Sequence, residues 1–490
     1  MSRFSFFICA TMLYALPLRA ETVSCRPGEL HSAVGAPASV TELVLTGSAD
    51  ASDFFFIGSE MTSLRLLDIS GLKIEAYHGP RLGTSSSWPA ATIPDGALAG
   101  TAIEAISFPT AQTAIGCSAF TSTALKQLVI PESVTHVGEN AFADCRCLTS
   151  ARIASARLGG FTFRGCDALE EVELDGCRTL DRADFAGCTS LASVKGSEEI
   201  GIIGDRAFEG CRSLKSFRFG KSLEVLGERA FALSGLESVT VPDGAPLDSI
   251  GPWAFADCCS LVRVELPQSM TGMARGAFFG CTALKSIALP GTETGDFILK
   301  GASALESVTL SGRTEYISPY TFFGASAVTL LTLPSGIDGL GDYAMAEMSG
   351  LKTVDASALS AVPTLGKDVF EGIDQPETTL RTDDRLTDSF RNAAQWQNFR
   401  IEGLSAIRDV HDAADAPVVR GRIADNRLEV EASGTTLSSI ELYDTAGQLL
   451  LSLKPRSESA DTDISSLSAS ILIVLCITAS GDRVSLKLAR

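Results

Sequence analysis

The chain has 490 residues, with 40 Lys or Arg and 59 Asp or Glu, and its formal net charge at pH 7 is −19. Nucleic acids and anionic membranes bind proteins that cluster basic residues, so this balance argues against both as main partners. Hydrophobic residues make up 45% of the chain, which is enough for a large core and excludes a wholly disordered protein.

Residues 1–20 have the features of a secretory signal peptide. Arg3 gives a positive start, an apolar run follows from Phe4 to Leu16, and Ala20 offers a cleavage point. A membrane anchor is one alternative, but roughly 13 apolar residues are too few to span ~30 Å of hydrocarbon as a helix. A lipid anchor at Cys25 is another, although the preceding residues fit a lipoprotein signal poorly. No later segment is long enough to span a membrane, so we predict a mature chain without a transmembrane segment.

After this leader, one unit recurs with the pattern I-G-x-x-A-F-x-x-C-x-x-L-x-x-V-x-L-P. Its aromatic position returns every 21 to 25 residues and carries no polar residue. The position is occupied by Phe120, Phe142, Phe163, Phe185, Phe208, Phe231, Phe255, Phe278, Phe322 and Phe370, and by Leu98, Leu299 and Met345. Such a period is typical of a solenoid, in which stacked turns bury one continuous core. We predict an array over residues 93–376 with these phenylalanines as its structural spine, and an N-terminal cap with degenerate repeats over residues 21–92.

Other columns of the unit predict its local structure. A Leu lies six residues after the aromatic in many units, and a V-x-L pair follows, as in Val172-Glu173-Leu174. Residues two apart on a strand share one face, so this pair predicts one short parallel strand per turn with both apolar side chains inward. A Gly lies four residues before the aromatic in most units, which we interpret as a turn that requires positive φ. These glycines are Gly116, Gly138, Gly159, Gly204, Gly227, Gly251, Gly295, Gly341 and Gly366.

The repeated unit resembles the BspA-type leucine-rich repeat of bacterial surface proteins. The resemblance extends over roughly Ile93–Gly372, and Leu299 and Met345 depart from it at the aromatic position. It implies a right-handed leucine-rich-repeat arc at the outer surface of a cell.

Six units carry a cysteine three residues after the aromatic, at Cys145, Cys166, Cys188, Cys211, Cys258 and Cys281. A disulfide framework is one interpretation for a secreted protein. A stack of small buried thiols is the other, and Ala302 and Ala325 at the same position of later units favour it.

No catalytic or metal-binding pattern accompanies the repeats. His31, His78, His136 and His411 are scattered, and the G-x-S-x-G, H-E-x-x-H, phosphate-loop and dinucleotide motifs do not occur in the sequence. We therefore predict no catalytic residue, no cofactor, no metal ion and no enzymatic activity.

The middle residue of each V-x-L strand is expected to face solvent. These positions form a candidate ligand-facing column of Arg152, Glu173, Lys195, Arg218, Thr240 and Glu265. Its charges alternate in sign, whereas a nucleic-acid interface should carry one sign. We predict that this face receives an extracellular protein or glycan, as solenoid faces often do. The alternative is that these residues only keep an exposed sheet soluble and stabilise the stack.

The repeat stops after Phe370. Residues 377–403 contain a strand-like and a helix-like segment and predict a C-terminal cap, while residues 404–417 are rich in Asp and Ala and predict a linker. Residues 418–490 predict a small all-β sandwich. Its strand-like runs are Leu428–Val430, Ile440–Tyr443, Leu449–Leu453, Ile471–Ile477 and Val484–Leu488.

Two blocks of this last domain, residues 443–447 (YDTAG) and 463–467 (DISSL), resemble the C-terminal sorting domain of type IX secretion cargo. The resemblance implies that residues 418–490 engage the secretion machinery and direct export to the outer surface of a gram-negative bacterium. Residues 468–470 (SAS) depart from the usual Pro-x-Gly, and Leu472 stands where an aromatic residue is common. A generic adhesive β-sandwich is the alternative.

Taken with the repeat array, these two terminal segments predict a secreted or cell-surface protein that acts like an adhesin. A structural cell-envelope or spacer component without a specific ligand is the alternative function.

Overall fold

The computed structural model describes residues 19–154, 156–404, 418–424, 426–433, 435–443, 449–465, 467, 471–479 and 483–489. The apolar run of the predicted signal peptide, His411 in the predicted linker, and residues 444–448, 466 and 468–470 of the sorting-like blocks lie outside the described residues. The chain divides into two units, Met1–Leu404 and Ser405–Arg490, and each has its own core.

The first unit begins with a cap in which one carboxylate joins two helices. α2 (Ala51–Glu60) begins after Asp50, whose N–H donates to the Asp53 carboxylate at 3.0 Å. The buried Asp53 carboxylate also accepts from the N–H groups of Gly28 (2.8 Å) and Leu30 (3.1 Å), at the start of α1 (Leu30–Ala33). Burial raises the pKa of Asp53, and these backbone donors oppose the shift.

Around these helices lies a four-stranded parallel sheet of order β1-β2-β3-β7. The thiol of Cys25, at the end of β1, is buried and donates to the Ser48 carbonyl at 3.3 Å, which does not suit attachment of a lipid. The remaining cap elements are η1 (Pro37–Ser39), β1 (Ala20–Cys25), β2 (Glu42–Ala49), β3 (Leu66–Ile74), β7 (Ala105–Ser107) and the antiparallel hairpin of β4 (Tyr77–Leu82) and β5 (Ser85–Trp88).

The V-x-L segments form short parallel strands that pair turn by turn, which confirms the predicted solenoid. Arg152 lies opposite both Val129 and Glu173, and Glu173 lies opposite Lys195. We call these strands the first ladder; they make three four-stranded sheets. The strands are β9 (Gln127–Ile130), β11 (Ser150–Ala154), β13 (Glu171–Asp175), β15 (Ser193–Lys195), β18 (Ser238–Thr240), β20 (Arg263–Glu265), β22 (Ser286–Leu289), β23 (Ser307–Leu310), β25 (Leu330–Thr332), β27 (Thr353–Ala356), β29 (Thr379–Thr382) and β30 (Arg400–Gly403).

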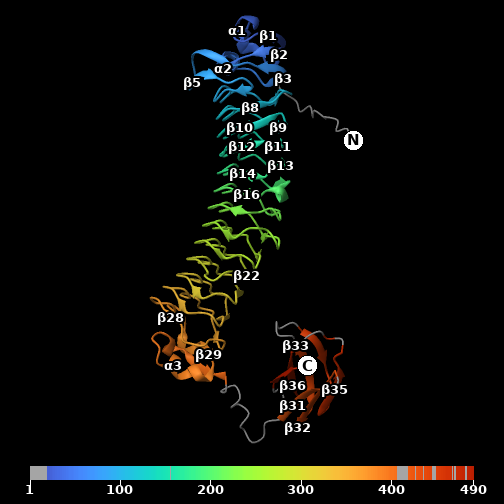
Figure 1. The fold of residues 1–490 in the computed structure, drawn as a ribbon, viewed down its shortest axis with the longest axis vertical. Coiled ribbons are helices and arrows are strands. Elements are labelled where there is room, and N and C mark those ends of the chain that lie inside the picture. The colour runs from blue at the N-terminus through green and yellow to red at the C-terminus, as the bar shows by residue number, and fades with distance from the viewer. Residues whose placement is uncertain are drawn as a thin grey trace. The chain divides into compact units, whose positions relative to one another are not determined.

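Most turns contain a second short parallel strand, which the prediction of one strand per turn did not include. These strands form a second ladder beside the first (Figure 1). Many are only two residues long, and a segment of that length shows no alternation of apolar and polar residues. The strands are β6 (Thr92–Ile93), β8 (Thr113–Ile115), β10 (Val134–Val137), β12 (Arg157–Leu158), β14 (Thr179–Leu180), β16 (Ile202–Ile203), β17 (Val225–Leu226), β19 (Ser249–Ile250), β21 (Gly272–Met273), β24 (Tyr316–Ile317), β26 (Gly339–Leu340) and β28 (Thr364–Leu365).

The phenylalanine column forms one buried row inside the array. From Phe120 to Phe278, neighbouring rings have centroids 5.0–5.6 Å apart and planes within 14° of parallel. Phe322 is fully buried in its own turn, and Phe370 packs 4.8 Å from the Trp396 ring. A buried Phe side chain contributes ~1.5–3 kcal/mol. This row, which we call the inner aromatic ladder, is therefore a main source of stability.

The glycine column has a different cause from the predicted one. Among the predicted glycines, only Gly295 has positive φ (77°). A Cβ atom on Gly138 or Gly227 would instead lie 2.5 Å or 2.6 Å from a backbone nitrogen of the preceding turn. Gly is needed there because stacked turns approach closely. Positive φ occurs two residues before and two residues after the ladder aromatic, as at Asn140 (56°) and Asp144 (55°).

The last turn of the array is covered by a short mixed segment. Phe390, Trp396 and Phe399 are buried there, and Phe399 packs edge-on 4.9 Å from Phe370. The Trp396 Nε1–H donates to the Pro363 carbonyl at 3.2 Å, so the indole is satisfied inside the core. The segment includes η3 (Gln375–Glu377), η4 (Asp384–Leu386), α3 (Thr387–Arg391) and η5 (Trp396–Asn398).

The second unit has two antiparallel sheets, of order β31-β32-β35 and β34-β33-β36-β37. Val430 of one sheet and Leu442 and Val474 of the other belong to the same buried cluster, so the sheets form a sandwich, as predicted. The five predicted runs became β32, β33, β34, β36 and β37, whereas β31 and β35 were missed. The strands are β31 (Val418–Ala424), β32 (Arg427–Ser433), β33 (Leu437–Tyr443), β34 (Leu449–Leu453), β35 (Ser459–Asp463), β36 (Ile471–Thr478) and β37 (Arg483–Ala489).

Candidate functional site

The predicted ligand-facing column lies on the outer side of the first ladder, and its N-terminal part is crossed by ion pairs. Arg152 contacts Glu173 at 3.6 Å and Asp175 at 3.1 Å, and Lys195 pairs with Glu171. All these side chains are largely exposed, and an exposed ion pair contributes about 0–1 kcal/mol. The pairs therefore determine the distribution of charge on this face and contribute little to the stability of the fold.

Farther along the column, Thr240 lies opposite Glu265. The Thr240 hydroxyl donates to the Glu265 carboxylate at 2.9 Å, and Arg263 pairs with the same carboxylate. The hydrogen bond from Thr240 and the Arg263 charge lower the pKa of Glu265. This carboxylate is ionised at neutral pH and already has two partners.

The column is interrupted at Arg218, which the sequence analysis placed in a strand. The chain forms no strand between β16 and β17, over residues 204–224, and Arg218 lies in this strand-free stretch. Phe217 and Phe219 occupy the inward positions; the Phe217 ring lies 5.2 Å from Phe208 and 4.9 Å from Phe231. These bulky rings take the place of the smaller Val and Leu of a regular strand.

The preceding turn is also irregular, at the point where its first-ladder strand, β15, ends. Gly196, with φ 77°, ends β15 and leads into η2 (Ser197–Glu199). The buried Ser197 hydroxyl donates to the Arg218 carbonyl at 3.0 Å, so that carbonyl bonds to a side chain. The division of the first ladder between β15 and β18 separates the first of its three sheets from the second.

A polar cleft lies at this division. It has a volume of about 340 Å³, and its lining includes Lys195, Arg218, Glu198, Ser193 and Ser216. We call it the mid-array cleft. Lys195 is paired with Glu171, whereas the Arg218 guanidinium has no ion pair with any carboxylate in the described part of the chain. The cleft therefore combines one unpaired guanidinium with a carboxylate and two hydroxyl groups.

The repeat geometry agrees with the comparison against protein families. The model named BspA type leucine rich repeat region matches residues 91–188, 178–302 and 248–377, which is more than half of the chain. The chain belongs to the BspA-type leucine-rich repeat family. No curated protein sequence matches it.

Several solved structures are similar to this BspA-type chain. A leucine-rich repeat protein from Bacteroides ovatus is 19% identical, with a TM-score of 0.49, over 78% of this chain and 87% of that one. A leucine rich cell surface protein from Faecalibacterium prausnitzii is 20% identical, with a TM-score of 0.35, over 62% and 87%. A leucine rich repeat protein from T. pallidum is 26% identical, with a TM-score of 0.29, over 37% and 78%. No catalytic family is indicated by any of these comparisons.

The cysteine column of the BspA-type array is a row of free thiols. Each thiol donates to the carbonyl of the ladder Phe in the preceding turn, as Cys188 does to Phe163 at 3.2 Å and Cys211 to Phe185 at 3.2 Å. Burial raises the pKa of Cys188 and Cys211, and that of Cys258 to about 11, so these groups stay protonated and unreactive. Between the two interpretations of the column, the structure has the stack of buried thiols.

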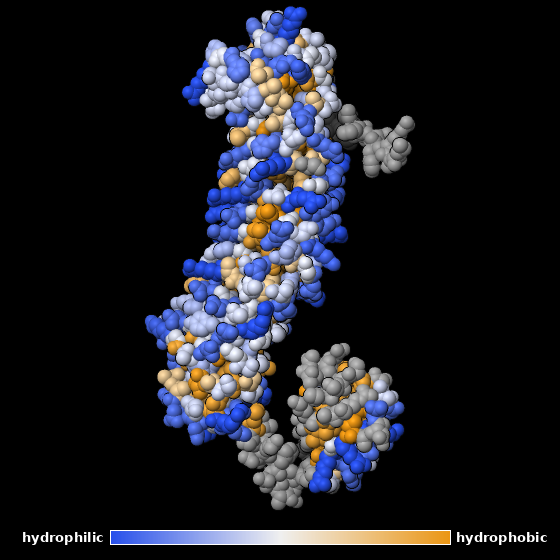
Figure 2. Space-filling view, in the orientation of Figure 1, coloured by the Kyte–Doolittle hydropathy of each residue, from blue (hydrophilic) through white to orange (hydrophobic). Residues whose placement is uncertain are grey.

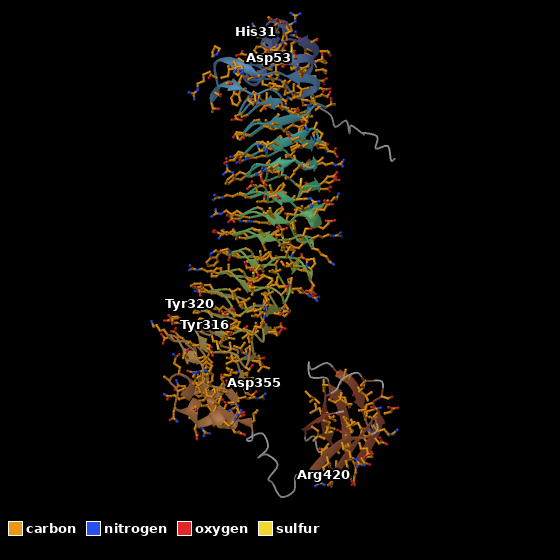
Figure 3. All side chains as sticks on the ribbon, viewed as in Figure 1. His31, Asp53, Tyr316, Tyr320, Asp355 and Arg420 are labelled. Atoms are coloured by element: carbon orange, nitrogen blue, oxygen red, sulfur yellow. The ribbon has the colours of Figure 1, made fainter. Side chains whose placement is uncertain are left out.

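A second aromatic row, which the sequence analysis missed, lies on the turn edge of the array. Trp253, Phe297, Tyr320 and Tyr343 each stand two residues before the ladder position, with φ between 55° and 59°, and all are half-buried. Phe297 and Tyr320 stack at 4.8 Å, and Tyr320 and Tyr343 at 5.0 Å. We call this row the outer aromatic ladder. In Figure 3, Tyr320 lies toward one edge of the array and Asp355, on the first ladder, toward the other.

Basic side chains cover the rings of the outer aromatic ladder. The Arg275 guanidinium lies 4.9 Å from the Phe297 centroid, and the Lys300 ammonium lies 4.7 Å from that of Tyr320. Cation–π contacts of this kind contribute about 0.5–1 kcal/mol at exposed sites. The rings of this row are therefore in contact both with neighbouring rings and with cations.

A cavity of about 680 Å³ lies on the β31-β32-β35 sheet of the second unit. Its charged groups include Arg422, Glu429 and Asp461. Arg422 pairs with Glu429 at 2.5 Å and Asp461 with Arg427 at 2.7 Å, so those charges satisfy each other on an open sheet.

The surface of the array is mainly hydrophilic on the face seen in Figure 2, with separate apolar patches and no continuous apolar stripe. Among the described residues, no group of three or more His, Cys, Asp or Glu side chains is arranged to hold a metal ion. Within the same residues, no helix has both the length and the hydropathy needed to cross a membrane.

Proposed function

We propose that this BspA-type protein is secreted or held at the cell surface, and that it binds an extracellular glycan or protein through the outer side of the first ladder, as an adhesin does. The observation that carries the proposal is the mid-array cleft, where the ligand-facing column leaves its regular pattern and presents an unpaired guanidinium. The other charged residues of the column have ion-pair partners, so this guanidinium is the charged group of the column that is left to meet a ligand.

The proposal includes a targeting segment at each end of the chain. Residues 1–20 act as a signal peptide, residues 21–92 and 377–403 cap the array of residues 93–376, and residues 404–417 link it to the sandwich. Residues 418–490 act as a type IX sorting domain, which places the protein on a gram-negative outer surface. The antiparallel sandwich of the second unit supports this role, because an independent core allows the sorting domain to fold by itself.

A structural spacer without a specific ligand is the second candidate function. The ion pairs of Arg152 and Lys195 favour it, because most charges in that part of the column already satisfy one another. A spacer would tolerate any soluble substitution on this face.

A binding screen separates the two functions. The purified chain is applied to glycan and matrix-protein arrays beside a variant with Arg152, Glu173, Lys195 and Arg218 all changed to Ala. A matched control carries His136→Ala, Arg157→Ala and Thr179→Ala, three exposed positions on the second ladder. We expect a ligand that the column variant loses and the control keeps. Binding that survives in the column variant, or no binding at all, would contradict the proposal, and the second result would favour the spacer.

Export is tested on intact cells. We expect the chain to be accessible to added protease, and mass spectrometry of the mature protein to find a new N-terminus close to residue 21. A chain that keeps residues 1–20, or one that is protected inside intact cells, would contradict the proposed targeting.

A further inference from the structure

We infer that the mid-array cleft is a subsite for an acidic sugar, whose carboxylate the Arg218 guanidinium binds. The inference deepens the proposed function and rests on it, because it names the class of ligand that the first-ladder face would take.

The charge of the cleft favours a singly charged anion. Of the three basic residues in the predicted column, Arg152 and Lys195 have carboxylate partners, whereas Arg218 has no ion pair in the described residues. A planar guanidinium matches a carboxylate through two parallel hydrogen bonds, which an ammonium cannot provide. Glu198 shares the cleft, and its negative charge would repel a doubly charged phosphate more strongly than a carboxylate.

The other polar groups favour a sugar over an acidic peptide. Ser193 and Ser216 offer hydroxyl groups, and the Glu198 carboxylate accepts hydrogen bonds, so the lining can match ligand hydroxyls that both donate and accept. Protein partners are usually anchored by aromatic or large apolar side chains at the centre of an interface. Here the rings of Phe217 and Phe219 point inward and are buried, so the cleft has no such anchor. A volume of about 340 Å³ also suits one or two sugar rings.

The walls of the cleft are fixed before any ligand arrives. A Cβ atom on Gly196 would lie 2.0 Å from the Leu174 carbonyl oxygen, and one on Gly220 would lie 1.7 Å from that of Glu198. The approach at Gly220 and the hydrogen bond from Ser197 to the Arg218 carbonyl hold the strand-free stretch against the preceding turn, and the approach at Gly196 holds that turn against β13. A site with fixed walls loses little conformational freedom on binding, which favours affinity.

The test is a titration of the purified chain with four probes. Sialyllactose and oligogalacturonate carry the two common kinds of sugar carboxylate, lactose is the neutral counterpart of the first, and a glutamate-rich peptide represents an acidic protein segment. We expect at least one acidic sugar to bind at least tenfold more tightly than lactose and the peptide, and the two acidic probes show which kind is preferred.

Three variants assign that binding to the cleft. Arg218→Ala should weaken it at least tenfold, and Arg218→Lys should weaken it less, because the charge remains but the paired donors do not. Arg157→Ala, an exposed arginine on the second ladder, should leave it unchanged. Thermal unfolding of each variant shows that a loss of binding is not a loss of fold.

Equal binding of lactose and both acidic sugars, tightest binding of the peptide, or full affinity of Arg218→Ala would each overturn the acidic-sugar subsite. If the array screen finds another ligand that depends on the column while none of these acidic sugars binds, the subsite is wrong and the proposed function stands. If no ligand depends on the column, both are wrong.

Discussion

The array contains two aromatic ladders, whose positions lie two residues apart within a turn, and they differ in burial. They share the turns of Phe255 and Phe322, whereas Leu299 and Met345 occupy the inner position beside Phe297 and Tyr343. The inner aromatic ladder is fully buried from Phe120 to Phe278, with ring centroids 5.0–5.6 Å apart. The outer aromatic ladder is half-buried, yet Phe297 and Tyr320 stack at 4.8 Å. The repeat of the turns therefore sets ring spacing on both sides. Stability should follow burial and not stacking, because most of the free energy of an aromatic side chain comes from the apolar area removed from water.

The sharpest contrast is expected at Phe208. Its ring contacts Phe185, Phe217 and Phe231 inside the array, so Phe208→Ala leaves a cavity and should lower the free energy of unfolding by about 3–5 kcal/mol. Neighbouring turns should loosen with it, since each turn is held by the next. Denaturant unfolding and amide hydrogen exchange measure both effects. An unchanged melting curve would show that Phe208 does not contribute to the stability of the inner aromatic ladder.

The next largest effect on stability is expected from a buried carboxyl group inside the array, and this effect depends on pH. Asp184 is fully buried beside Phe185, at a position that is Ala in many turns, and burial raises its pKa from 3.8 to about 6. The folded chain then binds this proton more tightly than the unfolded chain. The contribution is most favourable below pH 3.8 and is lost as pH rises through about 6.

Asp184→Ala should remove that dependence. The stability of the unmodified chain relative to the variant should fall by about 3 kcal/mol between pH 3.5 and pH 7. Unfolding measured in denaturant at several pH values gives the difference directly, and the subtraction removes the other titrating groups. A difference that is flat with pH, or that grows toward neutral pH, would contradict the raised pKa.

The smallest effect is expected on the outer aromatic ladder. Tyr320→Ala loses three ring contacts and the Lys300 cation, but its ring is half-buried, so we expect a cost of about 1 kcal/mol. Tyr320 also has φ 57°, which Gly adopts without strain. Tyr320→Gly should therefore destabilise less than Tyr320→Ala. A cost equal to that of Phe208→Ala would mean that the two ladders are energetically equivalent.

The inner aromatic ladder could be predicted from the sequence, because a buried position must be apolar in every turn and so leaves a regular signal. The outer aromatic ladder could not, because its column also holds Ser118, Ala183 and Arg206 in other turns. Positive φ at these positions leaves no glycine signal when the residue is Trp253 or Tyr320.

The candidate site was only partly predictable. Phe217-Arg218-Phe219 keeps the apolar-polar-apolar pattern of V-x-L, and Arg218 is exposed between two buried rings, but the predicted strand does not form there. The first ladder is interrupted because of the size of these two rings and the 3-10 helix at Ser197–Glu199. Neither feature alters the spacing of apolar residues in the sequence. The cleft, which depends on both, had no sequence signal.

The thiol-to-carbonyl row has a consequence for how such arrays can change length. Each cysteine joins its own turn to the one before it by the same contact, as Cys166 does to the Phe142 carbonyl and Cys281 to the Phe255 carbonyl. Deleting or duplicating one complete repeat rebuilds this contact at the new junction, whereas disulfides joining fixed pairs would leave an orphaned sulfur. The gene can therefore gain or lose repeats without any covalent cross-link having to be reassigned.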